Sequence, residues 1–186
     1  MRRLTPALLS LSLAAPLSAQ TTAPPVETPP LPATVPAAAP ADVASMDGIM
    51  AALYDVISGP AGKPRDWARM RSLFVPEARM VPTRTAKDGA VRMRWMGVND
   101  YVAMSGALIE RDGFHERELA RRVDRFGPIA QVFSTYDGRT DKGDYHERGI
   151  NSLQLLFDGK RWWIVSIMWA GETPDTPLPA SYLPKP

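Results

Sequence analysis

The stretch RGINSLQLLFDGKRWWIVSIMW, from Arg148 to Trp169, decides the fold of this chain. It contains two runs rich in apolar, β-branched and aromatic residues, separated by Asp158-Gly159. An Asp-Gly pair between two such runs favours a two-residue hairpin turn. Apolar residues fall on both alternating positions of each run, so we expect a hairpin that is covered on both faces.

A tight turn sets an expected pairing, in which Leu155 faces Trp162 and Phe157 faces Lys160. One face of the hairpin then carries these residues: Asn151, Leu153, Leu155, Trp162, Ile164, Ser166 and Met168. Helices from the preceding part of the chain can cover one face. Exposed apolar patches of this size usually mark contacts between proteins, so we expect the other face of the hairpin to lie in a homodimer interface. The alternative is that residues 170–186 fold back over it.

The remaining chain predicts helices first and strands afterwards. Apolar residues at helical spacing and helix-stop signals predict three helices, over Val43–Ile57, Trp67–Phe74 (with Asp66 as N-cap) and Asn99–Glu110 (with Asn99 as cap). Two short strands are expected at Arg79–Thr83 and Val91–Met96, followed by four long ones: Phe114–Phe126, Ile129–Tyr136, Tyr145–Phe157 and Arg161–Trp169. This order predicts an α+β fold, with the helices gathered on one face of an antiparallel sheet.

The first residues have the layout of a secretory signal peptide. Arg2 and Arg3 precede an apolar run from Leu4 to Leu17, and a small-residue cleavage site predicts residues 1–19 as the leader. The apolar run is shorter than the roughly 20 residues that span a bilayer, and the chain has no cysteine that could carry a lipid anchor. We therefore expect an exported protein, periplasmic or secreted, without a stable membrane anchor.

Proline-rich segments flank the expected domain at both ends. Residues 21–41 contain seven of the 19 prolines and one charged residue, so residues 20–41 are predicted to form an extended tether. The folded domain is expected over residues 42–173. Residues 174–186 are again Pro-rich and are predicted to run extended over the surface.

The charge balance gives no support for nucleic-acid binding. The sequence has 22 Lys and Arg against 20 Asp and Glu, and the excess of two equals Arg2 and Arg3 of the predicted leader. The mature chain would thus be near neutral, without the excess of Lys and Arg that binding to nucleic-acid phosphates requires. The absence of cysteine excludes disulfides, thiol nucleophiles and thiolate metal sites.

A family resemblance is carried by RFGPIAQVFSTYDGR, by the opening hairpin and by the closing LPASYL. Together with the element order, these segments resemble the nuclear transport factor 2-like superfamily over roughly residues 43–183, most closely its exported bacterial members without assigned activity. The resemblance implies a cystatin-like cone, in which three helices and the concave face of a strongly bent sheet enclose a pocket. It also implies that dimers are common.

The superfamily includes ketosteroid isomerases and SnoaL-like cyclases, whose pockets use a carboxylate or His as general base, often with a Tyr or protonated acid as donor. Tyr54 is a plausible counterpart of the isomerase tyrosine. Val81 and Pro82 stand where the isomerase base is expected, and Leu153 stands where its second acid is expected. This pattern argues against that particular reaction.

The other candidate catalytic residue is His115, flanked by Glu116 and Glu118, because a His–carboxylate pair can act as a general base. A solvated strand start is the alternative reading of that segment. Candidate ligand contacts lie on the predicted pocket face of the hairpin: Asn151, Leu153, Trp162 and Ser166. Asn151 interrupts an apolar strand, so its amide is expected either to hydrogen-bond within the sheet or to face a ligand.

No spacing of His115, His146 and nearby acids matches a metal site, and no GxSxG, phosphate-loop or dinucleotide motif occurs. We therefore expect neither a metal nor a cofactor. Three functions remain open: an exported small-molecule-binding domain, a lyase or isomerase acting on a small apolar or polycyclic substrate, or a non-catalytic interaction module of the cell envelope.

Overall fold

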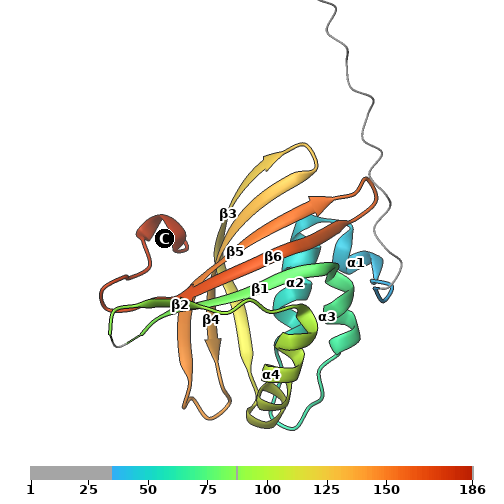
Figure 1. Ribbon diagram of the computed structural model, residues 1–186. Helices are drawn as coiled ribbons and strands as arrows, with labels where there is room; N and C mark the ends of the chain where they lie inside the picture. The colour runs from blue at the N-terminus through green and yellow to red at the C-terminus, as the bar shows by residue number, and fades with distance from the viewer. Residues whose placement is uncertain (1–34, 87, 186) are drawn as a thin grey trace, which may run out of the picture. The chain divides into compact units, whose positions relative to one another are not determined.

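The computed structural model of the protein describes residues 35–86 and 88–185 (Figure 1). The predicted signal peptide, residues 1–19, and the tether as far as residue 34 lie outside the described residues. None of the described helices is long and apolar enough to cross a membrane.

The described chain forms helices, a six-stranded sheet and a short C-terminal turn of helix. The helices are α1 Pro40–Val43, α2 Met46–Ile57, α3 Trp67–Leu73, α4 Val98–Asp112 and the 3₁₀ helix η1 Ala180–Tyr182. The strands are β1 Phe74–Thr85, β2 Val91–Met93, β3 His115–Phe126, β4 Ile129–Arg139, β5 His146–Phe157 and β6 Trp162–Gly171. Their order across the sheet is β2-β1-β6-β5-β4-β3. The α+β fold class is confirmed.

Local side chains explain where the helices begin. The Ser45 hydroxyl accepts a hydrogen bond from the amide of Gly48 at the start of α2, and Asp66 caps α3 through the amide of Arg69, as predicted. The predicted cap Asn99 is wrong. The cap of α4 is Gly97, two residues earlier, and the Asp100 carboxylate reaches back to the amide of Gly97 at 2.8 Å.

The sheet departs from the prediction at one pairing. Strands β3 to β6 form an antiparallel meander, and β2 pairs antiparallel with β1. Strand β1 runs parallel to β6, so the sheet is mixed rather than wholly antiparallel. A parallel pair needs a long crossover, which β2, α4 and the other three strands supply here.

The hairpin of β5 and β6 also differs from the expected pairing. Phe157 pairs with Trp162, not with Lys160, because the loop is longer than two residues. The Asp158 carboxylate holds it by accepting hydrogen bonds from the amides of Lys160 and Arg161, both at 2.8 Å.

A register shift follows in the same hairpin. Gln154 pairs with Ser166 but Leu155 pairs with Ile164, so β6 holds one extra residue at this point. The extra residue exchanges the two faces of β6 beyond Ile164. Ile167 and Trp169 therefore join Asn151 and Leu153 on the inner face, in place of the predicted Ser166 and Met168.

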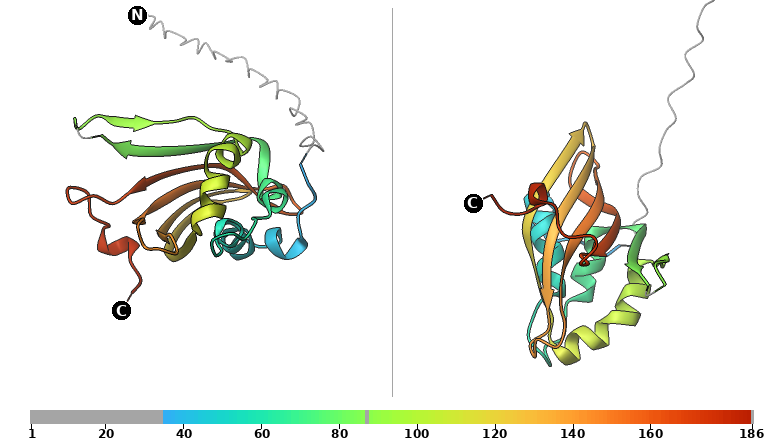
Figure 2. Two further views of the ribbon diagram at one scale, coloured as in Figure 1. Left: turned by 90° about the horizontal axis from the view of Figure 1, so that it is seen from below. Right: turned by 90° about the vertical axis from the view of Figure 1, so that its left-hand side faces the viewer.

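The helices lie on one face of the curved sheet, and the C-terminal segment lies on the other (Figures 1 and 2). The inner face carries the core, built around side chains such as Ile49, Met70, Leu153 and Ile164, which have no exposed surface. On the outer face, the Thr135 hydroxyl donates to the Tyr182 carbonyl at 2.6 Å, and the Tyr182 ring packs on Phe133. The tail thus covers part of the second face.

Candidate functional site

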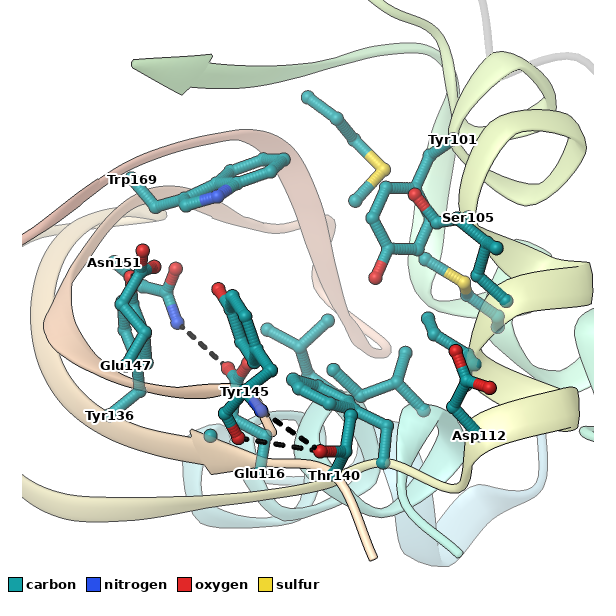
Figure 3. A pocket seen from close by; sticks show the side chains of 18 of the residues that line it. Tyr101, Ser105, Asp112, Glu116, Tyr136, Thr140, Tyr145, Glu147, Asn151 and Trp169 are labelled. Atoms are coloured by element: carbon teal, nitrogen blue, oxygen red, sulfur yellow. Dashed lines mark hydrogen bonds between the residues drawn. The ribbon is translucent and has the colours of Figure 1, made fainter. Parts of the chain in front are cut away.

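A cavity of about 410 Å³ lies between α4 and the inner face of the sheet. Core side chains form part of its lining, among them Leu53, Ile57, Met70 and Ile167. Polar side chains reach it from both sides, from α4 and from the sheet, as Figure 3 shows. A cavity with mostly apolar walls and a few converging polar groups has the character of a small-molecule site.

Two glutamates reach the cavity from a single row of the sheet. Glu116 of β3 pairs with Gly138 of β4, and Gly138 pairs with Glu147 of β5. The two carboxylates therefore lie on the same face, two strands apart, with no side chain between them. A Cβ added to Gly138 would lie 3.0 Å from the Phe114 ring and 3.4 Å from Glu116 Oε2, so this glycine keeps the space open.

The next row places a tyrosine beside Glu147. Tyr136 of β4 is buried, and its hydroxyl donates to Glu147 Oε1 at 2.6 Å. Its partner across the sheet is Gly149, where an added Cβ would lie 2.5 Å from the Tyr136 hydroxyl and 2.2 Å from the Ala170 carbonyl oxygen. A Cβ on Gly171 would lie 2.7 Å from the Glu147 carboxyl carbon. These glycines make room for the Tyr136–Glu147 pair.

Behind Glu116 lies a buried hydrogen-bond network. Asn151 Nδ2 donates to the Tyr54 hydroxyl at 3.2 Å and contacts Glu116 Oε1 at 3.4 Å. The Tyr54 hydroxyl bonds to Ser134 Oγ at 2.6 Å, and Ser134 donates to Glu118 Oε1 at 2.5 Å. Helix α2 is thereby tied to three strands. Burial raises the pKa of Tyr54, so its proton is firmly held.

The surroundings of Glu116 alter its acidity. Loss of contact with bulk water raises its pKa to about 7, and the charge of Glu147 acts in the same direction. The hydrogen bond from Asn151 opposes this shift and is the smaller effect. A carboxyl with this pKa can take up or release a proton near neutral pH.

Aromatic side chains from α4 and from the sheet also line the cavity. Tyr101 of α4 and Trp169 of β6 meet edge to face, with ring centroids 6.3 Å apart. Phe114 and Tyr145 form a second pair at 6.4 Å. Figure 3 shows the Tyr101 hydroxyl and the Trp169 ring pointing toward the open space.

The structure brings together two of the residues singled out from the sequence. Asn151 lines the cavity, and Tyr54 lies directly behind it as its hydrogen-bond partner. Leu153 lies in the core, fully buried, and does not line the cavity.

Three other candidates lie elsewhere. His115 points away from the cavity, where Nε2 bonds to Asp141 Oδ1 at 2.7 Å and the side chain is 45% exposed. Its neighbour Glu116 takes the inward position, because successive strand residues face opposite sides. Trp162 packs on Phe157 in the core and lines no part of the cavity. Ser166 lies beyond the register shift and pairs with the exposed Gln154.

Sequence reasoning did not identify Glu116, Tyr136 or Glu147 as cavity residues. A signal exists in the spacing, since Glu147, Gly149 and Asn151 alternate on one face of the strand that continues into Leu153. Among the described residues, no group of three or more His, Cys, Asp or Glu side chains could hold a metal ion.

No protein-family model matches the sequence, and no curated protein matches it. Solved structures do. A protein of unknown function from Mycobacterium tuberculosis is 13% identical over 74% of this chain and 80% of its own, with a TM-score of 0.51. An NTF-2 like protein of unknown function from Silicibacter pomeroyi is 18% identical over 69% of this chain and 94% of its own, with a TM-score of 0.48.

An uncharacterised protein with a cystatin-like fold from Caulobacter vibrioides is 12% identical over 71% of this chain and 90% of its own, with a TM-score of 0.52. At such identities the likeness concerns the fold alone. The helices on the inner face of a curved sheet and the cavity between them agree with it. The chain therefore has the cystatin-like fold that its sequence predicted.

Proposed function

We propose that this protein binds a small, largely apolar molecule in the cavity between α4 and the inner face of the sheet. The observation that carries the proposal is the cavity of about 410 Å³, whose lining is mostly apolar and includes a few polar side chains. Its volume falls within the range of about 300–1,000 Å³ typical of small-molecule sites. Gly138 and Gly149 keep space that ordinary side chains would fill.

Native mass spectrometry of the purified protein, followed by denaturation and analysis of what is released, tests the proposal, together with a fragment screen by NMR. Ser105 of α4 lines the cavity, so Ser105→Trp is expected to fill it and abolish binding. Ala103 is exposed on the same helix and does not line the cavity, so Ala103→Trp serves as the matched control. Binding that survives Ser105→Trp, or no bound compound and no fragment hit, would overturn the proposal.

One observation favours a second candidate function, general acid–base catalysis of the lyase or isomerase type. Glu116 faces the cavity with a pKa of about 7, the condition under which a carboxyl transfers protons efficiently near neutral pH. In this role Glu116 replaces the predicted His115, and Tyr54 acts through Asn151.

The test is hydrogen–deuterium exchange at carbon in small carbonyl compounds that bind the protein. Glu116→Gln is expected to abolish exchange. Glu77→Gln, an exposed carboxylate on β1, should leave the rate unchanged. The pH–rate profile should show an apparent pKa near 7, and a rate that is independent of Glu116 would exclude this role.

Two sequence-based expectations complete the proposal. The charged, apolar and small-residue order of residues 1–19 supports export. The exposed apolar side chains Val165 and Met168 on the outer face support a homodimer. Mass determination of the mature N-terminus in the exporting cell tests the first, since an intact Met1 in the functional protein would contradict export by cleavage.

A further inference from the structure

The charged groups at the cavity are all of one sign. Asp112, Glu116 and Glu147 line it, and among its described lining residues none is Lys, Arg or His. Asp112 is paired with Arg111, through bonds of 2.7 and 2.5 Å. No ion pair joins Glu116 or Glu147 to a basic side chain among the residues that the structure describes.

Glu116 also holds an acceptor oxygen that the protein does not use. Its Oε1 has one long contact with Asn151, at 3.4 Å, and no donor among the described residues bonds to its Oε2. Glu147 is held only by tyrosine hydroxyls, because Oε1 accepts from Tyr136 at 2.6 Å and Tyr145 is a further hydrogen-bond partner. A carboxylate away from bulk water is costly unless a donor or a positive charge meets it. The site therefore calls for a donor from the ligand.

The aromatic side chains of the cavity favour a cation in a second, independent way. Tyr101, Tyr145 and Trp169 line the same space as the two glutamates, as Figure 3 shows. Tyrosine and tryptophan rings attract ammonium groups, and the attraction grows when the cation is shielded from water. An anionic ligand would instead meet two carboxylates with no basic partner.

We propose that the ligand of this cavity is an organic cation, an amine in its ammonium form, whose charged nitrogen lies between Glu116 and Glu147 and beside the aromatic rings that line the same space. This rests on the proposed binding function and gives it a ligand class. The ammonium N–H groups donate to the carboxylate oxygens. The hydrocarbon portion packs against apolar lining residues such as Leu53 and Ile167.

A charge series of nearly equal size tests the ligand class: 2-phenylethylammonium, 2-phenylethanol and 3-phenylpropanoate. Binding is measured by isothermal titration and by the shift of the Trp169 indole resonance in NMR, at about pH 8, where the amine is charged. The cation is expected to bind about tenfold more tightly than the alcohol, and the carboxylate more weakly than both. Benzyltrimethylammonium, which has no N–H, separates the aromatic contribution from hydrogen bonding.

The variants Glu116→Gln and Glu147→Gln should each weaken binding of the cation about tenfold and so reduce its preference over 2-phenylethanol. Glu77→Gln, remote and exposed, should alter neither. If the alcohol binds as tightly as the cation, or if both glutamine variants retain the preference, the ligand class is wrong while the binding function stands. If no compound binds and native mass spectrometry releases nothing, the binding function itself fails.

Discussion

Glu116 and Glu147 face one cavity from strands β3 and β5, and Gly138 of β4 stands between them in register. The arrangement places two carboxylates at one site without ion-pair partners among the described residues. Two like charges near each other disfavour joint ionisation. The first predictions therefore concern the protonation of Glu116.

Glu116→Gln is expected to change the pH dependence of stability. The pKa of Glu116 is raised from 4.5 to about 7 in the folded protein, so the folded state binds more protons than the unfolded state between these values. The free energy of unfolding of the wild type should then fall as pH rises from about 4.5 to 7, by on the order of 2 kcal/mol.

The glutamine variant lacks this titration, so it should be more stable than the wild type above pH 7, and the advantage should vanish below about pH 4.5. Urea denaturation across this range measures the difference. Glu77→Gln, on the same sheet but exposed, is the control. An equal effect of both variants at every pH would show that Glu116 titrates normally.

Binding of an ammonium ligand should release a proton from Glu116 between about pH 5 and 7. The cation favours the ionised carboxylate, while Glu147 on β5 opposes ionisation and Asn151 supports it. The buried tyrosines Tyr54 and Tyr136 stay protonated throughout. Titration calorimetry in buffers of different ionisation enthalpy counts the proton, and the affinity should rise with pH in this window. A pH-independent affinity would rule out coupling to Glu116.

Gly149→Ala tests the space beside the Tyr136–Glu147 pair. The new Cβ would meet the Ala170 carbonyl oxygen at 2.2 Å and the Tyr136 hydroxyl at 2.5 Å, and the oxygen belongs to backbone that cannot move aside. We expect destabilisation by about 2–3 kcal/mol, measured by urea denaturation.

Gly97→Ala is the comparison, because Gly97 has φ of −82° and its added Cβ would lie 3.5 Å from Asp100 Oδ2, an ordinary contact. Gly97→Ala should lower the free energy of unfolding by only about 1 kcal/mol, the loss expected from a changed helix cap. Equal losses in the two variants would mean that the packing at Gly149 is not the cause.

Tyr54→Phe tests the network behind the cavity. Loss of the hydroxyl leaves Asn151 Nδ2 and Ser134 Oγ without this buried partner, which should cost about 1–3 kcal/mol of stability. Tyr182→Phe is the control, because Tyr182 contributes its ring and its backbone carbonyl to the outer face. A loss below that of Tyr182→Phe would indicate that water replaces the Tyr54 hydroxyl.

The fold could be predicted because its signals are local. Helical spacing in VASMDGIMAALYDVI, the cap Asp66 and the long alternating strands each follow from nearby residues. The parallel pairing of β1 with β6 could not be predicted, because it joins segments far apart in the chain and no turn sets its register.

The site was predicted in part for the same reason. Asn151 was singled out as a polar residue within an apolar strand, and Tyr54 through the family resemblance; the structure joins them at 3.2 Å. Ser166 was expected on the cavity face, but a register shift that no sequence pattern announces turns it to the other face. His115 was chosen as the candidate base, but it is the next residue, Glu116, that faces the cavity. A strand's two faces cannot be assigned until a partner fixes its register.

The outer face gives the last prediction, on how its apolar residues are covered. Tyr182 of the tail packs over Phe133, yet Val165 and Met168 remain 38% and 41% exposed on β6. We expect these two side chains to lie in a homodimer interface. Sedimentation velocity should give a dimer for the wild type and a monomer for the double variant Val165→Lys, Met168→Lys, because two lysines on a shared face repel their copies across the two-fold axis.

Phe126→Lys provides the control for that experiment, since Phe126 is 84% exposed at the end of β3, away from the β5–β6 surface. It should leave the dimer intact, and thermal unfolding should confirm that the double variant is folded. A wild-type monomer at about 100 μM, well above the dissociation constants of stable dimers, would assign the covering role to the tail alone. In that case deletion of residues 174–186 should expose Phe133 and Thr135 and lower the stability of the monomer, because Tyr182 would no longer cover them.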